Sequence, residues 1–382
     1  MSSQIGEGVR SVRLAAAGLS LIAVCYGLAR FAYGLFVPAF RNTFDLDATA
    51  AGVIAAGSYV AYCVGVIAAT AATPRFGARP VAVGAGALAT AGTTIIALAP
   101  DALVLAVGVI IAGSSTGVAS PPLAHAVARR VAPATRDRTQ AVVNAGTGLG
   151  VMVSGPVALL VQDQWRLAWL AFAGIAAAVT IWCALAIPVE RDENRGGGGS
   201  ARGLRRPGAL RLVVAAAVMG AASAAGWTFG QDLLTTAGGH TQTFSTIAWI
   251  TLGASGLLGA AAGDLAARLG LRRTWMALMI AMSASMVALA AAPQNAIVAL
   301  LGSAVFGAVY IALTGLLLVW GIEVFDGEPA LGVGLVFLVL ALGQAGASPL
   351  LGLVADGAGV TTAFWVAAAV AVLGAFACPR RG

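Results

Sequence analysis

Three polar side chains recur at helical spacing inside an apolar stretch near the N-terminus. Tyr26, Arg30 and Tyr33 follow one another at intervals of four and three residues, which places them on one face of a helix. A guanidinium group flanked by two phenol hydroxyls suits a carboxylate or another planar anion, because its N–H donors match two oxygens at once. The pattern predicts an anion-binding position at Arg30.

The depth of Arg30 strengthens this prediction. If a membrane span covers residues 14–38, Arg30 lies about 6 Å from the midplane at a rise of about 1.5 Å per residue. A charge at that depth costs about 3 kcal/mol or more, and such residues mark substrate or ion paths. Two other interpretations stay open. Arg30 extends its head to the outer interface, or it pairs with an acidic residue such as Asp232.

Composition places these residues in lipid. The chain has 382 residues, of which 59% are hydrophobic and only 10% are charged. A soluble protein carries about 25% charged residues, so most of this surface is expected to meet lipid. The 50 glycines favour close helix packing in a bilayer, where apolar attraction between helices is weak. We therefore predict a membrane protein.

The sequence lacks the residues needed for ATP-driven transport, for catalysis and for a metal site. All 22 basic residues are Arg, so a phosphate-binding loop with its lysine is excluded, and with it ATP-driven transport by this chain alone. No catalytic constellation is present, and we predict no enzyme activity. The cysteines have no metal-ligand spacing, which argues against a disulfide framework, a metal site or a cofactor. They are Cys25, Cys63, Cys183 and Cys378.

Twelve apolar segments are long enough to span a bilayer as helices. Their connections are short except for 190–208, a Gly- and Arg-rich linker that separates an N-terminal half, 1–189, from a C-terminal half, 209–382. The predicted spans are 14–38, 49–72, 80–99, 102–124, 139–161, 166–188, 209–231, 244–264, 274–292, 295–320, 330–354 and 359–377.

The net charge is +7, and the positions of the arginines follow the membrane topology, so nucleic-acid binding is not expected. With the N-terminus in the cytoplasm, 19 arginines fall in cytoplasmic segments and two, Arg41 and Arg166, on the opposite side. This bias is the positive-inside signal. It predicts an even number of spans with both termini in the cytoplasm. The first span is interpreted as uncleaved, because it is longer than a signal-peptide core.

An internal repeat appears when the chain is shifted by 193 residues. Residues that end or bend helices then coincide, which chance similarity between apolar segments would not produce. Two halves with the same orientation, joined by a cytoplasmic linker, are one known transporter architecture. The matching pairs are Gly27 and Gly220, Arg75 and Arg268, Gly77 and Gly270, Arg79 and Arg272, Pro100 and Pro293, and Pro156 and Pro349.

Two loops that the repeat aligns resemble the signature loops of the major facilitator superfamily, which read Gly-x-Leu-Ala-Asp-Arg-x-Gly-Arg-Arg. The signature aspartate is replaced by Pro74 in one loop and Ala267 in the other, which puts its latching role in doubt; Asp264 is a candidate substitute one turn away. The matching gating residues are Arg75, Gly77 and Arg79 in the first loop and Asp264, Arg268, Gly270 and Arg272 in the second.

Four further segments are similar to the YbfB/YjiJ-like bacterial branch of this superfamily. The resemblance implies an all-α membrane fold of twelve transmembrane helices in two pseudo-symmetric six-helix bundles. It further implies a monomer in the cytoplasmic membrane of a bacterium that moves a small-molecule substrate by alternating access. The segments are 26–34, 144–156, 165–169 and 227–232.

The resemblance also implies which spans line the substrate path, namely the first, fourth, seventh and tenth. Ordinary hydrogen bonding between helices in lipid is the alternative for each polar residue there. Beyond Tyr26, Arg30 and Tyr33, the candidates in these spans are Ser114, Ser115, Thr116, Trp227, Gln231, Tyr310 and Thr314, and Asn144 of the fifth span is a further candidate substrate contact.

Coupling to protons needs a titratable group that both sides can reach. Asp232 and His125 are the candidates, although no acidic residue lies at a predicted midplane. The favoured function is transport of a small organic anion. One alternative is efflux of hydrophobic or cationic drugs, and another is a membrane sensor or enzyme without transport, for which the chain offers no catalytic group.

Overall fold

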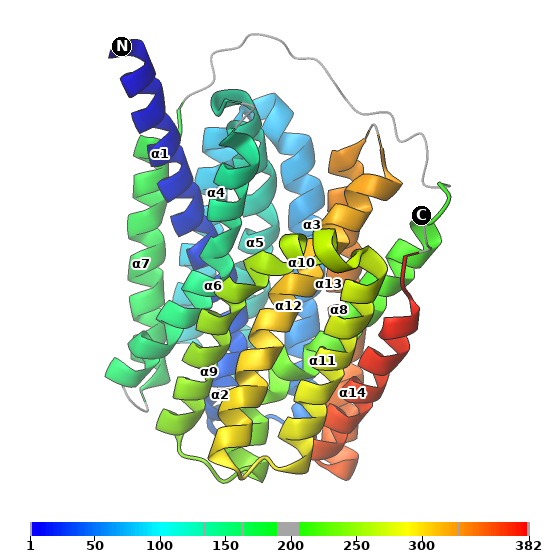
Figure 1. Ribbon diagram of the computed structural model, residues 1–382. Helices are drawn as coiled ribbons and strands as arrows, with labels where there is room; N and C mark the ends of the chain where they lie inside the picture. The colour runs from blue at the N-terminus through cyan, green and yellow to red at the C-terminus, as the bar shows by residue number, and fades with distance from the viewer. Residues whose placement is uncertain (1, 133–134, 162–163, 189–205, 327, 380–382) are drawn as a thin grey trace. The chain divides into compact units, whose positions relative to one another are not determined.

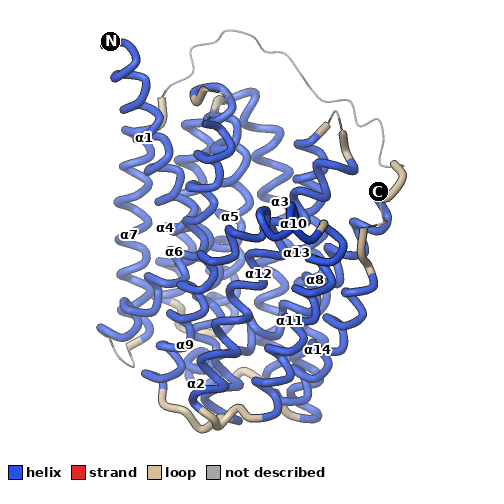
Figure 2. Tube along the Cα trace, viewed as in Figure 1, coloured by secondary structure: helices blue, strands red, loops and turns tan. Residues whose placement is uncertain are grey.

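The computed structural model describes residues 2–132, 135–161, 164–188, 206–326 and 328–379, and these contain helices and connections but no β-strand (Figures 1 and 2). Most of the predicted linker 190–208 lies outside the described residues. The all-α membrane fold predicted from the sequence is confirmed.

Helices cover each predicted span. The first eight elements are α1 (Ser2–Ile22), η1 (Ala23–Phe31), α2 (Ala32–Phe44), α3 (Ala48–Phe76), α4 (Ala78–Leu98), α5 (Ala102–Arg130), α6 (Arg136–Leu160) and α7 (Trp165–Ala186). The others are α8 (Ala209–Asp232), η3 (Leu233–Ala237), α9 (Gln242–Gly256), η4 (Leu257–Ala261), α10 (Ala262–Leu269), α11 (Leu271–Ala291), α12 (Ala296–Val324), α13 (Pro329–Ala358) and α14 (Val360–Phe376).

Ten helices among the described residues are long and apolar enough to cross a membrane, and α14 is a shorter apolar helix. The predicted span 244–264 is broken into α9, a 3-10 turn η4 and α10. Gly259 in η4 packs closely on α12, since a Cβ there would lie 2.8 Å from the Ala308 carbonyl oxygen. The number of twelve spans therefore stays a prediction.

The described chain forms two compact units. The first contains residues 1–32 and 61–198, and the second contains residues 33–60 and 199–382. The second unit therefore includes most of α2 and the start of α3. The halves 1–189 and 209–382, inferred from the repeat, stay a prediction.

The repeat is visible in local geometry inside each unit. Gly77 precedes α4 with φ 84°, and Gly270 precedes α11 with φ 83°. Only glycine adopts this conformation without strain, which is why both signature loops need it. A polar side chain also caps the N-terminus of the next helix in each unit, Asp101 for α5 and Asn295 for α12.

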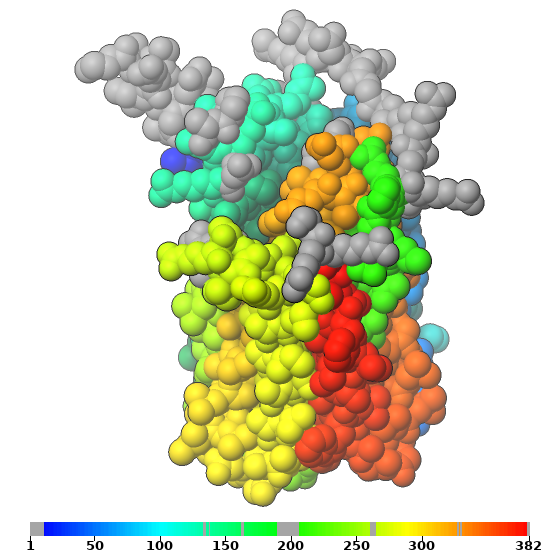
Figure 3. Space-filling view, turned by 45° about the vertical axis from the view of Figure 1, so that its right-hand side comes forward, coloured from blue at the N-terminus to red at the C-terminus, as the bar shows by residue number. Residues whose placement is uncertain are grey.

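In the second unit, α11 and α14 lie side by side (Figures 1 and 3). Two side chains of α11 donate hydrogen bonds to carbonyl groups of α14. Trp275 Nε1 lies 3.0 Å from the Gly374 oxygen, and Ser283 Oγ lies 3.0 Å from the Ala368 oxygen. Such bonds tie helices together where lipid offers no hydrophobic drive for association.

In the first unit, η1 and α6 touch through glycine. A Cβ on Gly150 would collide with the Ala23 carbonyl oxygen, and one on Gly27 would collide with the Gly150 backbone. Gly150 of the predicted fifth span therefore serves close backbone packing against the helix that carries Arg30.

Replacing Gly150 with Val should lower the apparent melting temperature of the detergent-solubilised protein by several degrees. Overpacking of a tight contact costs about 1–3 kcal/mol. The matched control is Gly174→Val in α7, where a Cβ would meet nothing within 4 Å. Equal melting temperatures for the two variants would contradict this packing account.

Candidate functional site

Arg30 lies in η1, a nine-residue π-helical segment in the first unit. Its side chain is buried, with 7% of the residue exposed. The guanidinium carbon stands 4.5 Å from the centre of the Tyr62 ring and 5.2 Å from that of Phe31. Contact with an aromatic face stabilises a desolvated cation by about 2 kcal/mol, so α3 contributes to holding the charge inside the unit.

Tyr26 also contacts Tyr62. The two rings meet edge to face with centroids 6.4 Å apart. The Tyr26 hydroxyl lies 2.9 Å from Ser120 Oγ on α5, at hydrogen-bond distance. Tyr26, Arg30, Tyr62 and Ser120 therefore form one polar and aromatic group, which we call the Arg30 cluster.

The Arg30 cluster can recognise a planar anion. A guanidinium that stacks on a ring face directs its N–H donors outward in its own plane, which is the geometry that a carboxylate or phosphate accepts. Phenol and hydroxyl groups nearby supply further hydrogen bonds. Sequence reasoning found Tyr26 and Arg30 but missed Tyr62 and Ser120, because neither has a marked spacing within its own helix.

Hydroxyl groups of α5 support the π-helical segment. Thr116 Oγ1 donates to the Cys25 carbonyl oxygen of η1 at 3.0 Å. Side-chain hydroxyls commonly satisfy backbone groups where a membrane helix departs from α geometry, and π segments are frequent at functional sites. Ser114 and Ser115 instead donate to carbonyl groups of their own helix, at 2.7 and 2.5 Å.

Two other predicted substrate contacts have hydrogen-bond partners of their own outside the Arg30 cluster. Asn144 is exposed on α6, and its amide oxygen accepts a hydrogen bond from Gln140 at 3.1 Å. Tyr33 is buried in the second unit, where its hydroxyl donates to the Ala51 carbonyl oxygen at 2.9 Å. The structure thus places Tyr33 in a different unit from Tyr26 and Arg30.

The second unit contains an aromatic cluster around Trp227. The Trp227 ring meets Trp249, Phe306 and Tyr310 edge to face, with centroids 5.9, 5.6 and 5.0 Å away. Gln344 of α13 reaches the Tyr310 hydroxyl at 3.5 Å. Sequence reasoning named Trp227 and Tyr310 as separate candidates, by family resemblance, and missed Gln344, which lies in a span that was not expected to line the path.

Two polar atoms beside this cluster are buried without a hydrogen-bond partner among the described residues. They are the Gln231 amide oxygen and the Thr228 hydroxyl, on residues that are 3% and 1% exposed. Buried polar groups without a partner are rare and each needs an explanation. Thr314, the remaining candidate here, donates to the Tyr310 carbonyl oxygen at 2.9 Å.

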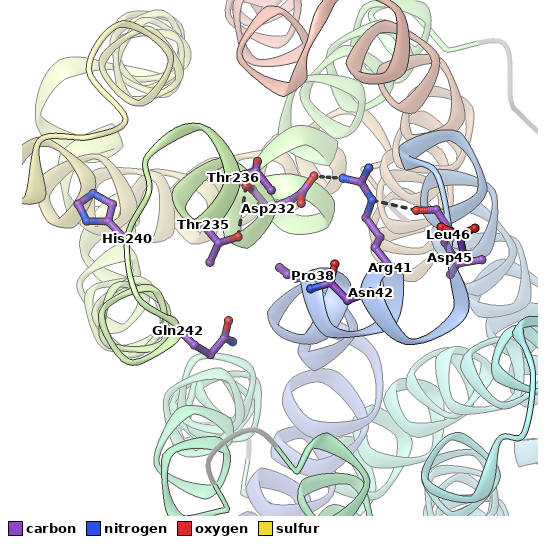
Figure 4. A pocket seen from close by; sticks show the side chains of 10 residues that line it. All are labelled: Pro38, Arg41, Asn42, Asp45, Leu46, Asp232, Thr235, Thr236, His240 and Gln242. Atoms are coloured by element: carbon purple, nitrogen blue, oxygen red, sulfur yellow. Dashed lines mark hydrogen bonds and ion pairs between the residues drawn. The ribbon is translucent and has the colours of Figure 1, made fainter.

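Asp232 forms an ion pair with Arg41, and its side chain is 3% exposed. Arg41 was expected in a connection beyond the first span, but α2 continues to Phe44 and carries it. The pair borders a polar cavity of about 640 Å³ that His240 and Gln242 also line (Figure 4). His125, the other candidate for proton coupling, is half-buried on α5.

The predicted gating loops lie at helix ends. Arg75, Arg268 and Arg272 are exposed, and Arg79 is half-buried. The Asp264 side chain lies outside the described residues, so its latching role stays a prediction. Within the described part of the chain, no group of three His, Cys, Asp or Glu side chains could hold a metal ion.

Comparison with known proteins gives partial sequence matches and matches of fold. A protein of Mycobacterium tuberculosis named a chloramphenicol efflux pump is 31% identical over 130 residues, which cover 33% of this chain and 32% of the relative. The matched stretch therefore spans about a third of that protein.

Solved transporters share the fold at low sequence identity. The nucleoside transporter NupG has a TM-score of 0.76 at 14% identity, over 96% of this chain and 98% of its own. A bacterial homologue of the human lysosomal transporter Spinster gives 0.74 at 13%, over 96% and 95%. A D-xylose–proton symporter gives 0.73 at 16%, over 96% of each chain.

The family model described as Major Facilitator Superfamily matches residues 19–329. This match covers most of the chain and agrees with the signature loops at Gly77 and Gly270. The YbfB/YjiJ-like branch is not tested by these comparisons and stays a prediction. The chain is a multi-pass membrane transporter rather than an enzyme, and it belongs to the Major Facilitator Superfamily.

Proposed function

We propose that this transporter moves a small organic anion by alternating access across the cytoplasmic membrane of a bacterium, as a monomer with both termini in the cytoplasm. The observation that carries the proposal is the burial of Arg30 against the Tyr62 ring within an apolar, membrane-spanning helix. Burying an arginine at such a position costs several kcal/mol. Binding of a solute carboxylate would explain why the chain carries one there.

The chemistry of the Arg30 cluster supports a carboxylate in particular. The guanidinium offers paired donors, and the Tyr26 and Ser120 hydroxyls lie on the same cluster. A guanidinium in a medium of low dielectric constant attracts a negative charge strongly. An anion would therefore gain more from this cluster than a neutral solute of the same shape.

Gln231 and Thr228 are a second candidate contact, proposed separately for the second unit. Their buried oxygens have no hydrogen-bond partner among the described residues, so a solute that donates a hydrogen bond would relieve an unfavourable burial. The ring of Trp227 beside them offers a flat apolar contact. These properties favour a solute that carries a hydroxyl or amino group in addition to its acid.

Efflux of a hydrophobic or cationic drug is the second candidate function. Two observations favour it, namely the likeness to a protein named a chloramphenicol efflux pump and the aromatic cluster around Trp227. Aromatic faces bind apolar and cationic solutes. Under this alternative, Arg30 serves helix packing and is not required for solute binding.

Replacing Arg30 with Ala should remove binding of organic anions, because the paired N–H donors are lost. Purified protein is heated with succinate, benzoate or lactate, and the shift in melting temperature gives the apparent affinity. We expect at least a tenfold loss in Arg30→Ala and a partial loss in Arg30→Lys, which keeps the charge but not the paired donors.

Arg166→Ala is the matched control for this experiment. Arg166 is also an arginine that contacts an aromatic ring, 4.2 Å from the Trp165 centroid, but it is exposed. Its replacement should leave anion affinity unchanged. If Arg30→Ala binds carboxylates as tightly as the parent, or if only chloramphenicol and tetraphenylphosphonium shift the melting temperature, the anion proposal is wrong and the drug alternative is favoured.

We also propose that transport is coupled to protons, with Asp232 and His125 as the candidate carriers. The fold shared with a D-xylose–proton symporter supports this coupling. In proteoliposomes, addition of a transported solute should then change the internal pH, and either Asp232→Asn or His125→Gln should abolish that change while solute exchange continues. Solute flux in the parent protein without any pH change would rule coupling out.

A further inference from the structure

The polar cavity of the second unit lies between the end of α2, the end of α8 with η3, and the start of α9 (Figure 4). Its volume is about 640 Å³, and sites for small molecules commonly have about 300–1,000 Å³. Eight of the ten described residues that line it are polar, so a hydrophilic solute suits it. The Arg30 cluster belongs to the first unit and shares no residue with it.

The charged side chains of this cavity leave an excess of negative charge. Arg41 and Asp232 form an ion pair, so their charges offset each other. Asp45, in the connection after α2, is a third charged residue of the lining, and it is exposed. The whole chain, by contrast, has a formal net charge of +7. The cavity therefore attracts a cation locally, although the protein as a whole repels one.

Several polar groups of the lining have already donated their hydrogens to the protein. The hydroxyls of Thr235 and Thr236 each donate to a backbone carbonyl oxygen one turn earlier. His240 Nε2 lies 2.9 Å from the Pro293 carbonyl oxygen, which can only accept, so Nε2 carries the hydrogen and Nδ1 of the neutral ring is an acceptor. Each of these groups can therefore accept a hydrogen bond from a ligand but cannot donate one.

The backbone at Asp45 indicates that its carboxylate has a role beyond the turn. Its φ is 53°, and it is the only non-glycine residue of the described chain with a positive φ. Glycine adopts this conformation without cost, and among other residues Asn and Asp tolerate it best. The turn itself does not require a carboxylate, because glycine or asparagine would serve there.

A small organic ammonium ion with a second donor group matches these properties. Its ammonium group supplies positive charge for Asp45 and N–H donors for the carboxylate and hydroxyl oxygens. The amides of Asn42 and Gln242 can both donate and accept, so either can bind a second amino group or a hydroxyl. Pro38 and Leu46 are the apolar members of the lining, and they suit a short methylene chain.

From this arrangement we propose that the cavity binds a small organic ammonium solute, of the kind that an α,ω-diamine represents, on the side predicted to be the cell exterior. Asp45 supplies the excess negative charge, and Asp232, Thr235 and Thr236 supply further acceptors. The ligand contacts α2, η3 and α9, so its binding raises thermal stability. The proposal is independent of the Arg30 cluster, which prefers the opposite charge, and failure of either leaves the other standing.

The experiment titrates the purified protein with putrescine in a neutral detergent. Binding is followed by the rise in melting temperature and by isothermal titration calorimetry, at about 0.15 M salt to screen distant charges. We expect saturable binding with a dissociation constant of about 1 mM or below. Two probes of similar size should bind at least tenfold more weakly, namely 1,4-butanediol, which has donors but no charge, and tetramethylammonium, which has charge but no N–H donor.

Asp45→Asn should weaken putrescine binding at least fivefold, because it removes the charge. Asparagine tolerates the same φ, so the melting temperature without ligand should stay close to that of the parent. Thr235→Val should weaken binding at least threefold through the loss of an acceptor. Asp47→Asn is the matched control. Asp47 is exposed two residues further on, is absent from the described lining, and accepts from the Ala50 N–H at 2.6 Å, a cap that asparagine can keep.

The control variant Asp47→Asn removes the same charge from the same connection and should leave the affinity for putrescine unchanged. Equal losses in Asp45→Asn and Asp47→Asn would overturn the proposal, since they would indicate general attraction to surface charge. Absence of saturable putrescine binding by the parent protein would also overturn it. Binding of 1,4-butanediol as tight as that of putrescine would do the same, because the cavity would then not recognise an ammonium group.

Discussion

A charge inside a membrane-spanning helix must find its stabilisation within the protein, and this constraint organises both units. In the first unit, the Tyr62 and Phe31 rings stabilise the charge of Arg30. In the second unit, Arg41 and Asp232 stabilise each other's charge as an ion pair. Tyr62 and Asp232 each come from a distant part of the chain, so these contacts form only when the helices are correctly packed.

Glycine and hydroxyl groups let the helices approach closely enough to meet that requirement. Gly27 and Gly150 bring the backbones of η1 and α6 into contact, and Thr116 satisfies a carbonyl group of the π-helical segment. The π-helical segment η1, which carries Arg30, is thus supported by both α6 and α5. Rigid support of this kind holds the guanidinium in place for a solute, because its position does not depend on the solute.

The sequence predicted those features that a single segment reveals. Apolar length, arginine bias and the 193-residue repeat predict the membrane fold, and Arg30 stands out because it is a charge in an apolar stretch. Tyr62, Gln344 and the partnership of Arg41 with Asp232 could not be predicted, because each depends on which helices pack together. The π-helical segment and the break between α9 and α10 were missed for a related reason, since tertiary contacts decide local geometry there.

The central claim is that Arg30 binds the transported anion, and a structure with a bound probe tests it most directly. Crystals grown with 4-bromobenzoate would locate the bromine by its anomalous scattering and the carboxylate by its density. We expect the carboxylate at hydrogen-bond distance from the Arg30 guanidinium, with the Tyr62 ring still stacked on it. A probe bound only elsewhere, with Arg30 engaged solely by protein groups, would contradict the claim.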